Sequence, residues 1–154
     1  MNDITAVLVH LMEENWLHAR QSEEKRAVLA IAVIVVSSAI QIALAFTGFS
    51  PKVLPLSLFL FLLGVYAVVF CLKLYERQLF HTYRARKLRA RLDEMCPGAA
   101  IEQLLKAAEV AHNAKYPFAH VRLNHIWLWL HSLIAVLGLA ETVLCLLSVQ
   151  WAHS

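Results

Sequence analysis

The sequence predicts an all-α membrane protein, and three observations carry this prediction. Of the 154 residues, 60% are hydrophobic and 16% are charged, whereas soluble domains contain about 25% charged residues. Three apolar segments, 27–47, 53–72 and 126–149, have the length of about 20 residues that a helix needs to cross a membrane. Most Lys and Arg residues lie between the second and third segments. We therefore expect residues 1–154 to form a single membrane domain.

An amphipathic helix is expected over residues 3–24, ahead of the first transmembrane segment. Ile4, Val7, Leu8 and Leu11 recur every three or four residues, while charged side chains occupy the other face. Such a helix either lies in the membrane interface or packs on another helix of the same protein.

The second transmembrane helix is expected to continue beyond residue 72. No Gly or Pro follows it before Pro97, so helical spacing runs on as far as Met95. A further helix is predicted over 99–114. Together these two helices predict a cytoplasmic helical hairpin over 73–118, and we expect apolar side chains to pack between them: Leu88, Leu92 and Met95 against Ile101, Leu104 and Leu105.

The basic residues predict the orientation of the chain. Ten Lys or Arg lie between Lys73 and Arg122, one lies between the first two transmembrane segments, and none follows the third. Because cytoplasmic loops carry the excess of Lys and Arg, the N-terminus and the hairpin are expected in the cytoplasm and Ser154 outside.

Glu141 is the residue that points most strongly to a function. It lies within the third transmembrane segment, where an ionised carboxylate is costly unless it faces protein or water. Ala135 and Gly138 form a small-residue face beside it, which is expected to allow close contacts between subunits. The functional interpretation is a polar pathway or a carboxylate ring in an oligomeric pore, and the structural one is a hydrogen bond to the first segment. The other candidates for these roles are His131, Gln41, Ser37 and Ser38.

Five basic residues crowd the helix that follows the second segment. Three explanations remain open: cytoplasmic topology with a solvated helix face, binding of anionic lipids or a protein partner, and binding of nucleic acid or an anionic nucleotide. These residues are Arg84, Arg86, Lys87, Arg89 and Arg91.

No catalytic or metal-binding signature is present in the sequence. The three Cys residues are widely scattered, and the spacing of the His residues matches no zinc pattern. No phosphate-binding loop or nucleophile elbow occurs. We therefore expect a protein that is not an enzyme and has no metal or other cofactor.

Several stretches together resemble the RipA-like small octameric membrane proteins: WLHAR and EEKR before the first apolar segment, YER and HTYRARKLR after the second, and RLNHIWLWLH entering the third. The layout is also similar to the small transmembrane effectors of bacterial anti-phage systems of the CRISPR-associated and retron types. The resemblance implies a homo-oligomer of the bacterial inner (cytoplasmic) membrane that alters membrane integrity when triggered. It transfers no active-site residue to this chain.

The expected function is accordingly an oligomeric membrane channel or membrane-disrupting effector in antiviral defence, controlled through the cytoplasmic hairpin. One alternative is a non-catalytic anchor or scaffold that recruits a soluble partner through that hairpin. A further alternative is a haem- or quinone-binding respiratory anchor subunit.

Overall fold

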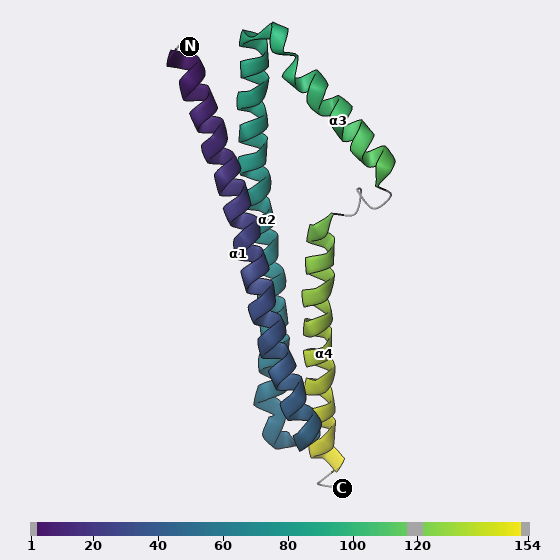
Figure 1. Cartoon of the computed structure of the whole chain (residues 1–154). Helices are drawn as coiled ribbons and strands as arrows, with labels where there is room; N and C mark the ends of the chain where they lie inside the picture. The colour runs from purple at the N-terminus through teal and green to yellow at the C-terminus, as the bar shows by residue number, and fades with distance from the viewer. Residues whose placement is uncertain (1–2, 117–121, 152–154) are drawn as a thin grey trace. The chain divides into compact units, whose positions relative to one another are not determined.

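The computed structural model describes residues 3–116 and 122–151, and every regular element within them is helical. The long helices are Asp3–Thr47 (α1), Leu54–Met95 (α2) and Leu123–Trp151 (α4), and a shorter helix covers Ile101–Lys115 (α3) (Figure 1). Short 3-10 turns cover Pro51–Val53 and Pro97–Ala99. Three helices are long and apolar enough to cross a membrane, which confirms the all-α fold class.

The expected N-terminal helix and first transmembrane segment are one continuous helix, α1. Its sequence contains neither Gly nor Pro between Asp3 and Thr47, so nothing interrupts the hydrogen-bond ladder. The helix ends at Gly48, whose φ of 68° is left-handed and whose N–H donates to the carbonyl of Leu44 at 2.9 Å. A glycine in this conformation is a common helix terminator because it has no Cβ to clash.

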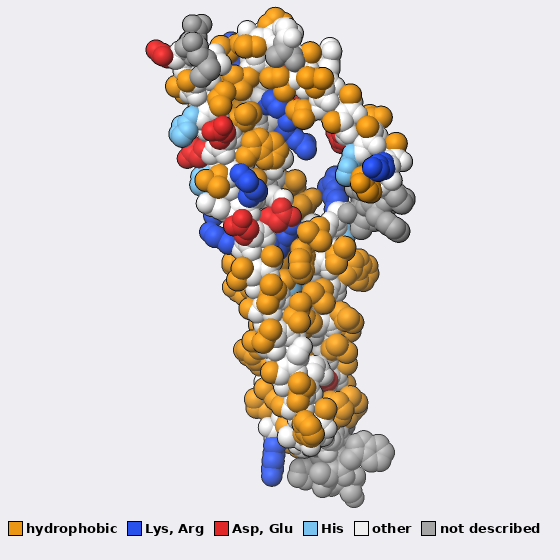
Figure 2. All heavy atoms as spheres, in the orientation of Figure 1, with side chains coloured by type: hydrophobic (Ala, Val, Ile, Leu, Met, Phe, Trp, Pro, Cys, Tyr) orange, Lys and Arg blue, Asp and Glu red, His pale blue; other side chains and the backbone are white. Residues whose placement is uncertain are grey.

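The chain divides into two compact units. The first contains Met1–Glu24 and Leu74–Leu123, and the second contains Lys25–Lys73 and Asn124–Ser154. In each unit, α1 and α2 run side by side in opposite directions (Figure 1). Charged side chains gather over the first unit, whereas the face of the second unit in Figure 2 is almost entirely apolar. An apolar outer surface is what lipid contact requires of a transmembrane unit.

Within the second unit, α1 and α2 bury side chains that alternate at spacings of three and four residues. This is the spacing of coiled-coil packing, in which each helix presents one narrow stripe to its neighbour. Many of the buried residues are small, and small residues let membrane helices approach closely. The stripe of α1 is Arg26, Ala30, Val33, Ser37, Ile40 and Leu44, and that of α2 is Ser57, Leu60, Gly64, Ala67 and Cys71.

Two glycines bring α2 and α4 into backbone contact. A Cβ placed on Gly64 would lie 2.5 Å from the backbone nitrogen of Ala135. A Cβ on Gly138 would clash with the backbone of Leu60 and Phe61. The small-residue face of α4 was expected to serve contacts between subunits, but the structure uses it for packing within one chain.

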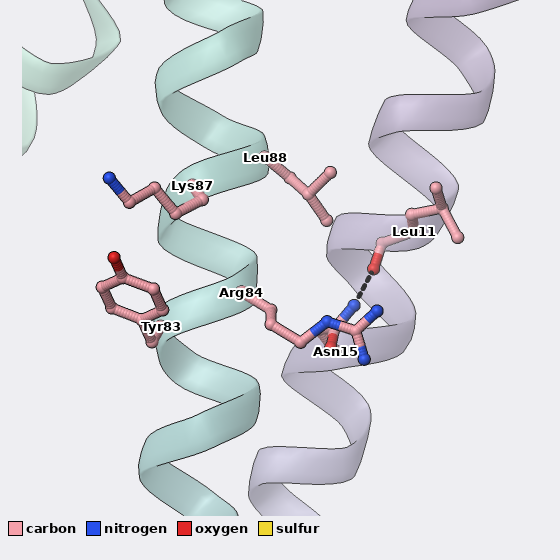
Figure 3. Close-up of a pocket in the computed structure, with 6 residues that line it drawn as sticks. All are labelled: Leu11, Asn15, Tyr83, Arg84, Lys87 and Leu88. Carbon is pink, nitrogen blue, oxygen red and sulfur yellow. Dashed lines mark hydrogen bonds between the residues drawn. The ribbon is translucent and has the colours of Figure 1, made fainter.

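The packed hairpin predicted over 73–118 is wrong in one respect: α3 buries none of its side chains, although residues 117–118 lie outside the described part of the chain. Leu104 is 67% exposed, and Leu105 is also exposed. The physical reason is competition for the apolar face of α2. Leu88 of α2 points toward Leu11 of α1 (Figure 3), so the N-terminal part of α1 occupies the position expected for α3.

α3 is attached to α2 through its N-terminal end. The Asp93 carboxylate accepts hydrogen bonds from the backbone N–H of Ile101 at 2.7 Å and of Glu102 at 3.4 Å. Arg89 lies 3.6 Å from the Glu102 carboxylate. An acidic group at a helix N-terminus accepts hydrogen bonds from the free N–H groups there, and its negative charge interacts favourably with the positive end of the helix dipole. The cap therefore fixes where α3 begins while leaving Leu104, Leu105 and Val110 exposed.

The glycine contacts predict how α2 and α4 respond to one added methyl group. Gly64→Ala and Gly138→Ala should each lower the free energy of unfolding by about 1–3 kcal/mol, because the overlap outweighs the better helix propensity of Ala. Gly98→Ala is the matched control, since a Cβ there meets no atom within 4 Å. Thermal unfolding of the full chain in detergent measures the effect. Unchanged melting of the first two variants would contradict the close contact.

Candidate intramembrane polar site

The buried face of α4 is polar, although the helix is otherwise apolar. Asn124, His131, Gly138 and Cys145 recur every seven residues on this face, and Glu141 lies on it seven residues after Ile134. His131 is 0% exposed and Glu141 is 7% exposed. A heptad spacing keeps these residues on the side that packs against the other helices. His131 and Glu141 therefore face the interior of the second unit, whereas His125 near the start of α4 is exposed.

Hydroxyl groups on this face find partners close by. The Thr142 hydroxyl lies 2.7 Å from the carbonyl oxygen of Gly138 and 3.3 Å from the hydroxyl of Ser57 on α2. Ser57 donates to the carbonyl of Leu54 at 3.0 Å and lies 3.9 Å from the Cys145 sulfur. Bonding to the preceding turn is the usual way a helical Ser or Thr satisfies its hydroxyl. These contacts join α2 to α4 at low energetic cost.

Three larger polar side chains on the same packed faces leave buried atoms without a partner in the described structure. They are both ring nitrogens of His131, Oε2 of Glu141 and Nε2 of Gln41. An unmet buried polar group costs about 1–3 kcal/mol, so native proteins contain few of them. The neighbouring hydroxyls of Thr142 and Ser57 already have hydrogen-bond partners. The polar atoms of His131, Glu141 and Gln41 are therefore the ones that could bind water or an ion.

An arginine is buried at one end of this unit. Arg26 is 2% exposed, and its guanidinium donates to the Asn124 side-chain oxygen at 3.3 Å. The contact joins α1 to the first turn of α4. A buried guanidinium is tolerated only where polar groups replace its hydration. Arg26 and Asn124 thus fix the position of the N-terminal end of α4. His131 lies two helical turns after Asn124.

The candidate residues from the first transmembrane segment lie in different environments. Ser37 is buried and donates to the carbonyl of Ile34 at 3.0 Å, whereas Ser38 is exposed. Gln41 is half-buried. None of the three is hydrogen-bonded to Glu141 in the described structure, so the predicted interhelical bond to the carboxylate is not formed.

Sequence reasoning did not single out Ser57 as a contact between helices, nor the pairing of Arg26 with Asn124. A signal for Ser57 was present, because it precedes Gly64, Ala67 and Cys71 at coiled-coil spacing. Arg26 also continues the buried spacing of α1, but an arginine at a membrane boundary normally reaches water, so its burial was not expected.

The basic run of α2 lies in the first unit, and its members differ in their neighbours. Arg89 contacts Glu102, and Arg91 contacts Glu94 at 2.7 Å. The Arg84 guanidinium lies 5.4 Å from the centre of the Phe80 ring, and the Lys87 ammonium lies 5.5 Å from that of Tyr83. Arg86 is exposed. Glutamates therefore neutralise the C-terminal end of the run, at Arg89 and Arg91. In the described structure, Arg84 and Lys87 nearer its start contact aromatic rings and not carboxylates.

A histidine pair joins α1 to α2 next to this run. The rings of His18 and His81 are 5.0 Å apart, and His81 Nδ1 lies 3.1 Å from the side-chain oxygen of Asn15. The Asn15 amide nitrogen donates to the carbonyl of Leu11, so its oxygen accepts and His81 Nδ1 carries the proton. Burial and the positive charges of His18, Arg77 and Arg84 hold the pKa of His81 below its usual value.

Comparisons with known proteins find no family model, no curated protein and no solved structure that matches the chain. Within the described residues, no group of three or more His, Cys, Asp or Glu side chains is arranged to hold a metal ion. His131 is the one buried histidine in the described part of the second unit, whereas bis-histidine haem ligation needs two. A functional assignment therefore rests on the buried polar residues of α4, His131 and Glu141.

The unmet ring nitrogens of His131 predict an unusual effect on stability. His131→Leu should raise the free energy of unfolding by about 1 kcal/mol or more, because it removes a buried polar group that has no partner. Asn124→Leu is the matched control on the same face, and it should destabilise by about 1–3 kcal/mol because it removes a partner of buried Arg26. Thermal unfolding in detergent distinguishes the two. A strongly destabilised His131→Leu would mean that His131 is a structural residue.

Proposed function

We propose that this protein is a homo-oligomeric channel or membrane-permeabilising effector of a bacterial inner membrane. The single observation that carries the proposal is the pair of ionisable side chains, His131 and Glu141, on the buried face of α4. Both have buried polar atoms without a hydrogen-bond partner in the described structure of the three-helix unit. Ionisable residues at such positions typically belong to ion or proton pathways.

The proposed resting state is closed. Glu141 is buried against its own chain, so it does not line a pore in this conformation. Opening requires α4 to separate from α2, which would expose Glu141, His131 and the hydroxyls of Thr142 and Ser57 to water. Three helices enclose no aqueous path by themselves, so the conducting form would be a homo-oligomer in which several α4 faces meet. Carboxylates exposed in this way favour cations.

Control of opening is assigned to the first unit. The distribution of Lys and Arg supports a cytoplasmic position for this unit, with the N-terminus inside and Ser154, beyond the described residues, outside. The element that precedes α4 in the chain is α3, whose start is fixed by the Asp93 cap. The resemblance to small anti-phage effectors supports a triggered activity in bacterial defence. The proposed activity needs neither a catalytic residue nor a cofactor.

A membrane anchor that recruits a soluble partner is the second candidate function. The observation that favours it is the unburied apolar side of α3, where Leu104 and Leu105 are 67% and 42% exposed. An amphipathic helix with this exposure is a common docking element. This candidate requires no ion path and predicts no role for the charge of Glu141.

Glu141→Gln tests the channel proposal against the anchor. The substitution keeps the shape of the side chain and removes the charge, so assembly should persist while cation flux through proteoliposomes falls about tenfold, equal to about 1.4 kcal/mol in the barrier. Glu13→Gln, at an exposed position of α1, is the matched control and should leave flux unchanged. Crosslinking in mild detergent reports the assembly of each variant.

Two results would overturn the channel proposal. One is a wild-type protein that is monomeric in mild detergent and carries no ion flux. The other is a Glu141→Gln variant that assembles and permeabilises liposomes as the wild type does. In the second case Glu141 would be a structural residue.

A further inference from the structure

Among the described residues of the first unit, the exposed cations Arg84 and Lys87 have no carboxylate within 4 Å. Of the five basic residues between 84 and 91, Arg89 and Arg91 each lie within 4 Å of a glutamate oxygen. Arg84 and Lys87 instead lie over aromatic rings, which attract a cation but leave its hydrogen-bond donors free. Both side chains are exposed. Arg84 and Lys87 are therefore two exposed cations, from adjacent turns of α2, that an anion could bind.

These two cations border a hollow between α1 and α2. The hollow has a volume of about 230 Å³ and is lined by Leu11, Asn15, Tyr83, Arg84, Lys87 and Leu88. Arg84 and Leu88 point from α2 toward α1, whereas Lys87 and Tyr83 stand on the other edge of α2 (Figure 3). Residues 84 and 87 are three apart, so they are neighbours on the helix surface. The four-carbon stem of Lys87 lets its ammonium swing toward a bound charge.

The rest of the lining is apolar or already hydrogen-bonded. The Asn15 side chain donates one N–H to the Leu11 carbonyl and accepts from His81, so its oxygen and one of its two N–H groups are engaged. Leu11 and Leu88 supply apolar surface, and Tyr83, which is 62% exposed, supplies a ring face. A ligand that fits must therefore combine a compact anion with a small apolar or aromatic group.

We infer that this hollow is a binding site for a phosphate monoester with a short apolar substituent, held by Arg84 and Lys87. Phosphate matches the pair because the guanidinium fork binds two of its oxygens and the ammonium binds as a point charge. The volume is below the roughly 300 Å³ of sites for drug-sized ligands, so the ligand is small. Its source is either a soluble phosphate ester or the headgroup of an anionic lipid such as phosphatidic acid. The inference is independent of the intramembrane site.

Phenyl phosphate is the probe for the soluble source. Isothermal titration of the full chain in phosphatidylcholine nanodiscs should show binding of phenyl phosphate and none of phenol. Arg84→Gln and Lys87→Gln should each weaken binding about tenfold, because each removes a charge-assisted contact. Arg86→Gln is the matched control: it removes an equal charge from the same run, does not line the hollow, and should change affinity by less than about twofold.

The His81 ring gives a second readout in the same samples. It is hydrogen-bonded to Asn15 and faces the positive charges of His18, Arg77 and Arg84, while Glu14 lies 3.8 Å from His18. A phosphate on Arg84 offsets one of the charges that lower the pKa of His81, so saturating phenyl phosphate should raise that pKa. Histidine NMR measures it, with the signal assigned through His81→Gln. Arg84→Gln should raise the pKa in the absence of ligand and abolish the further rise.

Sedimentation with vesicles tests the lipid source. Nanodisc-embedded protein should be retained by vesicles containing phosphatidic acid more than by pure phosphatidylcholine vesicles, and Arg84→Gln should lose this retention while Arg86→Gln keeps it. Binding of either probe with this dependence on Arg84 and Lys87 supports the inference and identifies the source. Failure of both probes, or equal weakening by Arg86→Gln, would overturn it, since the cations would then act only as general surface charge.

Discussion

The close contact between α2 and α4 is the constraint on which the second unit depends. Gly64 and Gly138 have no Cβ, so each lets the backbone of the facing helix approach where any other side chain would clash. With the backbones this near, short side chains such as Ser57 and Thr142 reach one another across the interface. Larger polar groups on the same face of α4, His131 and Glu141, are then enclosed by their own chain. One packing device thus both stabilises the bundle and buries its ionisable groups.

The buried polar groups of the second unit fall into two kinds, those that stabilise the packing of the helices and those that do not. Hydroxyls that bond to the preceding turn or across to a neighbour add to packing, whereas His131 and Oε2 of Glu141 gain nothing from their positions. Replacement of a buried polar group by an apolar one of similar shape is often neutral or stabilising. In the proposed function, the cost of keeping these two residues is offset by an open conformation in which they meet water. In that account the glycine contact is also the contact that must break during opening.

The helical fold could be predicted from the sequence because it rests on long-range composition: apolar length, the glycines and prolines at the turns, and the absence of breakers between Asp3 and Thr47. Reasoning about charge in apolar helices indicated that Glu141 faces protein or water, whereas the complete burial of His131 could not be predicted in this way. Which helix covers which face could not be predicted in this way. Leu88 has helical partners available both in α1 and in α3, and only three-dimensional packing shows that it turns toward Leu11. Likewise, nothing local to Arg26 indicates that Asn124, 98 residues away, receives its guanidinium.

A disulfide between α2 and α4 tests the central claim most directly, namely that α4 docks on α2 of its own chain through its polar face. The Ser57 hydroxyl lies 3.9 Å from the sulfur of native Cys145, so Ser57→Cys in a chain with Cys71→Ala and Cys96→Ala should form this bond on mild oxidation. Mass spectrometry of the oxidised full chain should find the linkage within one polypeptide, and reduction should restore any ion flux that the bond suppresses. Free thiols after oxidation, or a linkage only between two polypeptides, would contradict the account.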